Sequence, residues 1–413
     1  MNKKIVLQSC IGNALEYYDF TLYGYLLPIL AAEFFPIQNT FLSTIAALAT
    51  YAVGFLFRPV GSIIFGFLGD KYGRKLSLTI SLFVMALSSG ILGLVPTYDQ
   101  IGLISPFLVI FARICQGICM SGECAGALIF AMEATKKSNL ASVGALISAS
   151  TFIGCFFAII ALITLLSGIF PEWAWRVCFL LGSLVGMVGF YIRFHLPESP
   201  EFEKLFNKIE KISFLNIIKK QYKNLLISII LVAACGVTAI FPTIYLNMFL
   251  TKSLGYTLRS SLMILAYGMF ISFLTSIVYS LYLKKFQPAK TVLYSNIIYV
   301  SILPIYLYAL ETHHFQLILF MQFNICVASA VLWSASSVII FTLFPTNIKY
   351  FSIALSDSLG KSIFVGSAPM ILWWMQSISV LFIELYYLIF LFQLLFTFIY
   401  IKRFTEEISH RVI

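Results

Sequence analysis

Twelve long apolar segments follow one another along the chain, and short polar breaks separate them. Each segment holds about 20 residues or more, the length that an α-helix needs to cross the hydrocarbon core of a bilayer. Helices are expected because a segment in lipid must satisfy its own backbone hydrogen bonds. The segments are expected near residues 8–32, 40–68, 76–95, 104–133, 142–166, 174–195, 225–250, 259–283, 290–310, 315–344, 351–375 and 379–401.

The composition indicates a lipid environment for these segments. Of the 413 residues, 60% are hydrophobic and 11% are charged, and the mean hydropathy is +0.95. A water-soluble protein of this length needs far more charge to cover its surface, so lipid must be the solvent. The sequence therefore predicts an all-α membrane protein with twelve transmembrane helices.

Lysine and arginine are distributed unevenly between the polar breaks. If both termini are cytoplasmic, 21 of the 27 basic residues fall on the cytoplasmic side. The opposite side holds only Arg176, Lys252 and Arg259. Because short cytoplasmic loops are enriched in Lys and Arg, this orientation is the expected one. The net charge of +10 is then a matter of orientation, and no nucleic-acid partner is expected.

The longest polar stretch, residues 197–224, divides the predicted spans into two groups of six. It begins with two prolines, which stop a helix, and continues as an amphipathic stretch. We expect it to lie on the cytoplasmic surface as a linker. The predicted organisation is a six-helix bundle over residues 1–196, this linker, and a second six-helix bundle over residues 225–413. Two such halves are typical of a transporter built from parallel repeats.

Acidic residues interrupt the first predicted span. Glu16, Asp19 and Tyr23 are spaced so that they share one helix face. A charge at bilayer depth costs at least about 2.5–3.5 kcal/mol, so each acid calls for a reason. Two nearby carboxylates in a low dielectric favour protonation of one of them, which makes proton coupling one interpretation. Pairing with basic residues of other helices is the alternative.

The fourth predicted span carries a second polar face. Gln116 and Glu123 are seven residues apart and therefore aligned, and Arg113 lies close to the same face. Small residues between them permit close helix packing, so this face should look into a protein cavity. We interpret Glu123 as a proton-coupling candidate and Gln116 and Arg113 as substrate-binding candidates. The planar fork of Arg113 suits a carboxylate, although a structural counter-ion for Glu16 or Asp19 is an equally simple reading.

Three further features have simple interpretations. Asp357 and Lys361 are one helical turn apart in the eleventh predicted span, so we expect them to neutralise each other. Trp333 can offer an aromatic face to a quaternary ammonium, and Tyr23 lies on the face of Asp19, so both are further substrate-binding candidates. The eight cysteines lie in apolar runs without a nearby His, so we expect packing and neither a metal nor a cofactor.

Several strings resemble the signatures of one transporter family. Residues 12–24 resemble G-N-x-x-E-W-x-D-F-x-x-Y-G, with Tyr for the Trp. Residues 58–62 (RPVGS) and 66–75 (GFLGDKYGRK) match that family's second span and the loop after it. Residues 116–127 resemble Q-G-x-S-x-G-G-E-x-x-G-A, and residues 173–179 resemble W-G-W-R-x-P-F without the Pro. The chain thus resembles the metabolite:proton symporter family of the major facilitator superfamily, which includes bacterial proline/betaine, dicarboxylate, citrate and shikimate transporters.

The resemblance implies alternating access, in which two six-helix bundles rock around a site near the midplane. Asp70, Gly73 and Arg74 match the superfamily's gating loop, and we group Arg58 with them because its motif precedes the loop. Asp70 and Arg74 then form a charge latch, or else a helix cap and an orientation signal. The second half matches more thinly, and its equivalent of the loop has decayed to residues 284–290 (KKFQPAK).

The function implied is proton-coupled uptake of a small organic solute across a bacterial inner membrane, by a protein that works as a monomer. Residues 126–133 look more like the proline/betaine members, which favours a zwitterionic osmolyte or amino acid. Arg113 favours a di- or tricarboxylate such as 2-oxoglutarate or citrate. An intramembrane enzyme or a non-transporting sensor is a remote alternative. The four histidines lie at span ends, so Ser/His catalysis inside the membrane lacks a general base.

Overall fold

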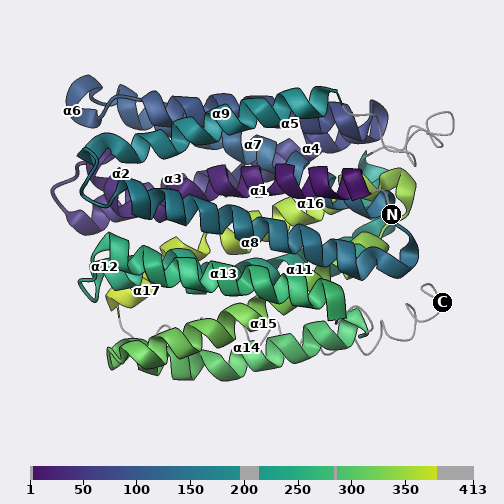
Figure 1. Cartoon of the computed structure of the whole chain (residues 1–413). Coiled ribbons are helices and arrows are strands. Elements are labelled where there is room, and N and C mark those ends of the chain that lie inside the picture. Colours follow the sequence, from purple (N-terminus) through teal and green to yellow (C-terminus); the bar gives the residue numbers. More distant parts are fainter. Residues whose placement is uncertain (1–2, 196–213, 283–285, 379–413) are drawn as a thin grey trace.

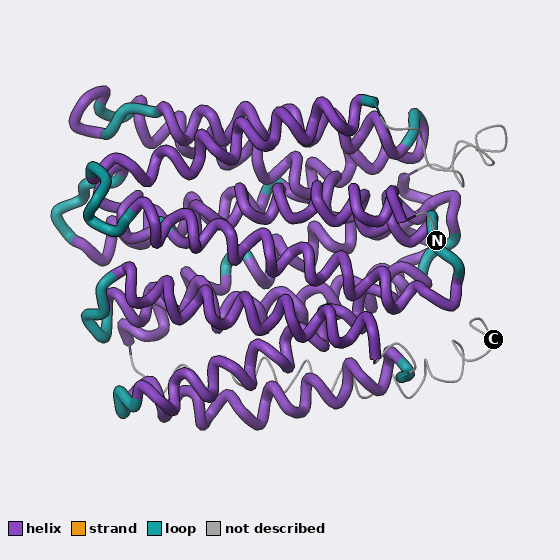
Figure 2. The backbone as a smooth tube through the Cα atoms, in the orientation of Figure 1, coloured by secondary structure: helices purple, strands orange, loops and turns teal. Residues whose placement is uncertain are grey.

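The chain is a bundle of long helices that run side by side, as the computed structural model shows for residues 3–195, 214–282 and 286–378 (Figure 1). Within these residues there is no strand, and most loops gather at the two ends of the bundle (Figure 2). Nine helices of the described ranges are long and apolar enough to cross a bilayer. The predicted all-α membrane architecture is confirmed.

The first half is built of α-helices joined by short turns. Its α-helices are α1 (Lys3–Tyr25), α2 (Leu27–Phe34), α3 (Thr40–Leu56), α4 (Arg58–Lys71), α5 (Arg74–Leu94), α6 (Tyr98–Ile101), α7 (Ile104–Glu133), α8 (Leu140–Leu165) and α9 (Trp175–Phe194). Two 3₁₀ turns, η1 (Lys137–Asn139) and η2 (Glu172–Ala174), lead into α8 and α9.

The second half contains two short π-helical segments as well as α-helices. Its elements are α11 (Phe214–Ile240), the π-helix η4 (Phe241–Tyr245), α12 (Leu246–Lys252), α13 (Leu258–Tyr282), α14 (Pro288–Glu311), α15 (Phe315–Thr342), the 3₁₀ turn η6 (Thr346–Ile348), α16 (Lys349–Gly360), the π-helix η7 (Lys361–Val365) and α17 (Ala368–Ile378). The helix α11 begins inside the stretch 197–224 that we expected to be linker. The predicted span 379–401 lies outside the described residues.

Prolines set the breaks within the predicted spans. Pro28 occupies the first turn of α2, and Pro59 occupies the first turn of α4. A proline lacks the N–H that an interior position must donate, so each starts a new helix instead of continuing the previous one. The first and second spans, each predicted as one segment, are therefore each built from two helices in sequence.

The two most extensive contacts between the halves are each formed by one pair of helices. The helix α8 of the first half packs along α13 of the second, and α4 packs along α16. Large apolar side chains such as Leu184, Tyr191 and Phe320 stay at least 60% exposed on the outside of the bundle. In a bilayer these side chains face the acyl chains, which is why a surface so apolar is stable.

Candidate functional site

Arg113 lies fully buried in α7, inside the first half. Its Nη1 donates hydrogen bonds to Gln116 Oε1 at 2.9 Å and to the Phe20 carbonyl at 3.4 Å. Its guanidinium carbon lies 4.4 Å from the ring centre of Phe20 and 4.6 Å from that of Tyr23. A methyl group at Gly54 would lie only 2.8 Å from Nη2, so this glycine makes room for the arginine. Cation–π contacts and two hydrogen bonds thus hold the charge in place.

A chain of hydrogen bonds connects Arg113 to Asp19. Gln116 Nε2 donates to Ser89 Oγ at 2.9 Å, and Ser89 Oγ in turn donates to Asp19 Oδ2. Asp19 is buried, and its second oxygen, Oδ1, has no hydrogen-bond partner among the described residues. The structure therefore brings Asp19, Gln116 and Arg113 into one network. Gln116 and Ser89 lie between Arg113 and Asp19, which form no direct ion pair.

Two neighbours of Asp19 were not predicted from the sequence. Ser89 links α5 to α1, and Gly182 of α9 lies so close that a methyl group there would be 2.4 Å from Asp19 Oδ1. Serines and glycines are common in these spans, so neither residue carried a signal of its own. Only the packing of α5 and α9 against α1 identifies them.

Arg58 shares the ring of Phe20 with Arg113. Its guanidinium carbon lies 4.6 Å from the Phe20 centroid and 4.3 Å from that of Phe55, and the side chain is 2% exposed. Arg58 begins α4, whereas the loop containing Gly73 follows the end of α4. A helix of 14 residues is about 21 Å long, so Arg58 and Gly73 lie at opposite ends of α4, and a shared gating role of the two residues stays a prediction.

The loop between α4 and α5 depends on Gly73. This residue has φ of 114°, a conformation that residues with a Cβ rarely adopt. The side chains of Asp70 and Arg74 lie outside the part of the chain that the structure describes, and so does that of Glu123. The charge latch and the role of Glu123 stay predictions.

Glu16 is buried on α1, where Cys124 Sγ lies 3.9 Å from its Oε2. This contact joins α1 to α7, whereas the contact of Asp19 with Ser89 joins α1 to α5. The two acids that share a helix face in the sequence thus meet different helices. Among the described residues, no three His, Cys, Asp or Glu side chains gather in a way that could hold a metal ion.

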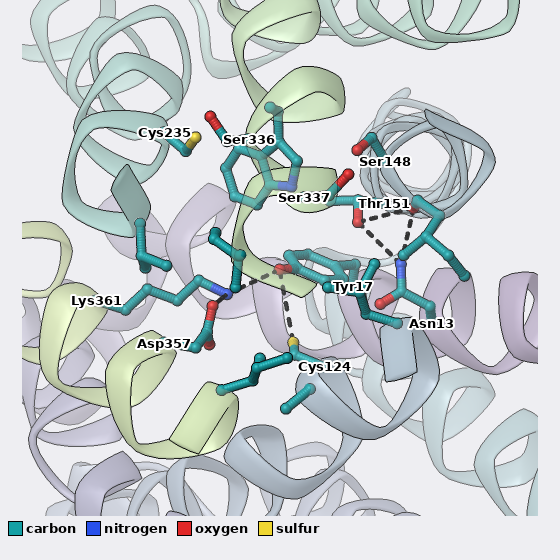
Figure 3. A pocket seen from close by; sticks show the side chains of 17 residues that line it. Asn13, Tyr17, Cys124, Ser148, Thr151, Cys235, Ser336, Ser337, Asp357 and Lys361 are labelled. Carbon is teal, nitrogen blue, oxygen red and sulfur yellow. Dashed lines mark hydrogen bonds and ion pairs between the residues drawn. The ribbon is translucent and has the colours of Figure 1, made fainter. Parts of the chain in front are cut away.

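A pocket lies between the two halves (Figure 3). The helices α1, α7 and α8 form its wall on one side, and α11, α15, α16 and η7 form the other. The residues that line it are Asn13, Tyr17, Cys124, Ala125, Leu128, Ile147, Ser148, Thr151, Val232, Cys235, Trp333, Ser336, Ser337, Ile340, Ile353, Asp357 and Lys361. Apolar walls with a few convergent polar groups are typical of a site for a small organic molecule.

Charged groups of the pocket come from the second half. Lys361 Nζ lies 2.8 Å from Asp357 Oδ1, so the predicted neutralisation within the helix is confirmed. Nζ also donates to the Tyr17 hydroxyl at 3.4 Å and lies 5.7 Å from the ring centre of Trp333. On the other wall, Asn13 Nδ2 donates to Thr151 Oγ1 at 2.9 Å. Both halves therefore contribute polar groups to one pocket.

Of the substrate-binding residues predicted from the sequence, the structure places only Trp333 in the pocket wall. Arg113, Gln116 and Tyr23 are 0% exposed and lie within the first half. The Tyr23 hydroxyl donates to the carbonyl of Ala47 at 3.3 Å. The pocket and the Arg113 network are thus two separate polar clusters, both of which include residues of α1.

Hydrogen bonds join the two halves near both ends of the bundle. At the end with the N-terminus, Tyr350 of α16 donates to the Gly122 carbonyl of α7 at 2.6 Å. Tyr350 also shares a hydrogen bond of 3.2 Å with Ser77 of α5. At the opposite end, Asn247 Nδ2 of α12 donates to the Tyr25 carbonyl of α1 at 3.1 Å.

Comparisons with known proteins agree with this architecture. The model of the Major Facilitator Superfamily matches residues 9–365. The chain is 29% identical to the proline/betaine transporter of Escherichia coli over 402 residues, covering 94% of this chain and 80% of that protein. It is 32% identical over 400 residues to a Staphylococcus haemolyticus protein provisionally named a proline/betaine transporter, covering 94% and 84%. The solved structure of the proton:xylose symporter XylE aligns with a TM-score of 0.80 at 14% identity, over 97% of this chain and 95% of that one, which is a likeness of fold.

Proposed function

Because the chain belongs to the Major Facilitator Superfamily of membrane transporters, we propose that it takes up a small zwitterionic solute together with a proton. The observation that carries this proposal is the pocket between the halves, with polar groups from both. A site that both halves share can open to one side or the other as they rock. The names of the relatives support a solute of the proline or betaine kind.

Asp19 is the proposed proton carrier. It is a buried acid in α1, the helix that also supplies Asn13 and Tyr17 to the pocket. Ionisable residues in spans mark ion pathways, because an acid without such a role is costly in lipid. The oxygen Oδ1, which has no hydrogen-bond partner among the described residues, offers a place for the proton.

The second candidate, a di- or tricarboxylate, depends on Arg113 as the clamp. The guanidinium of Arg113 is enclosed by Phe20, Tyr23 and Gln116 within the first half, outside the pocket wall. This placement favours the zwitterion. We further propose that both termini are cytoplasmic, from the distribution of basic residues. The bacterial relatives support a place in the bacterial inner membrane, and we propose that the chain works there as a monomer.

Asp19→Asn separates proton coupling from solute binding. In liposomes, uptake of proline or betaine driven by a pH gradient should fall to background, because Asn cannot carry the proton. Exchange of internal for external solute without a gradient should continue, since the pocket is intact. Asp99→Asn is the matched control, because Asp99 is exposed in α6 and should keep full uptake. Gradient-driven uptake at the native rate by Asp19→Asn would exclude this role.

A further inference from the structure

Asp357 and Lys361 stand out in the pocket because they form a buried ion pair on one helix. Asp357 lies in the last turn of α16, and Lys361 begins the π-helix η7. Their side chains are 15% and 7% exposed, and Figure 3 shows both beside Tyr17. We propose that this pair is the headgroup site for a zwitterion: Lys361 takes the carboxylate, and Asp357 together with Trp333 takes the positive group. The inference rests on the proposed function and deepens it.

Both members of the pair have capacity for a further partner. Asp357 Oδ2 is buried and has no hydrogen-bond partner among the described residues. Lys361 Nζ carries three donors, and its contacts with Asp357 and Tyr17 use two of them. A carboxylate that approaches Lys361 from the pocket can therefore accept a hydrogen bond from Nζ before the ion pair with Asp357 breaks.

The ring of Trp333 supplies the second half of the site. Lys361 Nζ already lies 5.7 Å from its centroid, within the range of a cation–π contact. When Lys361 turns toward a substrate carboxylate, an ammonium or quaternary ammonium of the same substrate can take its place between Trp333 and Asp357. Quaternary ammonium groups donate no hydrogen bond, so an aromatic face and a carboxylate suit them.

The charge of the pair selects for a molecule with both signs. Separating a buried ion pair leaves two uncompensated charges in a low dielectric, which is strongly unfavourable. A zwitterion compensates both charges at once. A dicarboxylate compensates Lys361 only, and it brings a second negative charge toward Asp357. The same two residues can thus bind proline or betaine and reject 2-oxoglutarate.

The backbone at the pair is suited to such a rearrangement. The π-helix begins at Lys361, where the regular hydrogen-bond ladder of α16 ends, and the Lys361 N–H is shared between the carbonyls of Asp357 and Ser358. Such π segments occur frequently at functional sites of helices. The side chain of Lys361 therefore stands where the regular α-helical hydrogen bonding changes.

Equilibrium binding tests the site without requiring proton coupling. The purified chain in lipid nanodiscs is titrated with radiolabelled glycine betaine, proline and 2-oxoglutarate. Lys361→Gln and Asp357→Asn should each weaken binding of betaine and proline at least tenfold. Lys361→Arg, which keeps the charge, should retain most of the affinity. Lys290→Gln is the control for loss of a lysine, since Lys290 is exposed in α14, and should bind as the native protein does.

A variant with one unpaired buried charge can fail to fold, so the doubly neutral Asp357→Asn/Lys361→Gln protein is measured as well. It should keep its thermal stability and still not bind betaine. Betaine affinity within twofold of native in folded Lys361→Gln, Asp357→Asn or the double variant overturns the headgroup site alone. Native protein that binds 2-oxoglutarate as tightly as betaine also overturns it, because the pair should reject a dicarboxylate. Native protein that binds neither betaine nor proline overturns the proposed function, and the headgroup site with it.

Discussion

At the scale of single residues, the first half holds its charges by aromatic rings as much as by hydrogen bonds. Phe20 lies between Arg58 and Arg113, with each guanidinium carbon less than 5 Å from its ring centre. Arg113 Nε and Nη2 are buried without a hydrogen-bond partner among the described side chains. The flat guanidinium can stack on Phe20 and Tyr23 with these atoms over the rings, which an ammonium cannot do as well.

Arg113→Lys should therefore lower stability and leave solute affinity nearly unchanged. Lysine keeps the charge but loses the stacking and the geometry toward Gln116, so the free energy of unfolding should fall by about 1–2 kcal/mol. Thermal unfolding and equilibrium binding of betaine on the same preparation measure both effects. A tenfold loss of affinity with an unchanged melting temperature would show that Arg113 contacts the solute after all.

At the scale of helices, glycines bring backbones of the first half into direct contact. A methyl group on Gly117 of α7 would lie 2.0 Å from the Gly54 carbonyl of α3, and one on Gly61 of α4 would lie 1.9 Å from the Ile118 carbonyl. Side chains instead mediate the contacts between the halves, as Tyr350 does against α4, α5 and α7. The first half is thus closely packed inside, and side chains form much of its boundary with the second half.

Tyr350→Phe should favour opening at the end with the N-terminus. The ring still packs against Gly69, but the hydrogen bonds to the Gly122 carbonyl and to Ser77 are lost. Net loss of about 1 kcal/mol shifts the equilibrium toward the open form roughly fivefold. Distances between spin labels at the last turn of α4 and the first turn of α16 report the populations of the closed and the open form. Tyr72→Phe, at an exposed tyrosine close by, is the control, and equal populations in both variants would show that the hydroxyl does not hold this end closed.

At the scale of the whole molecule, the sequence predicts the membrane spans better than it predicts which side chains of different helices contact one another. Apolar length defines the helices, and Asp19 and Arg113 were identified because a charge in such a segment is conspicuous. Ser89 and Tyr350 were not identified, since their importance depends on which helices meet. Asp357 and Lys361 were expected to pair, but only the packing of α16 against the first half places them in a pocket.

The orientation of the molecule is open to a direct measurement. Gln38 and Lys137 lie in connections between spans. Three spans separate them, so they lie at opposite ends of the bundle. An enzyme reporter that is active only outside the cytoplasm should be active when fused after Gln38 and silent after Lys137, as the basic residues predict. Activity at Lys137 would reverse the orientation.

Cys124 lies in the pocket wall with its sulfur 3.6 Å from the Tyr17 hydroxyl, and contacts between the halves lie beyond it toward each end. Cys124 is partly buried, so we expect its access to reagents from each compartment to depend on whether the contacts on that side hold. Its alkylation by a maleimide should be faster from a side whose contacts have opened. The rate at which Cys124 of the native protein is labelled from each side should therefore report how often that side is open.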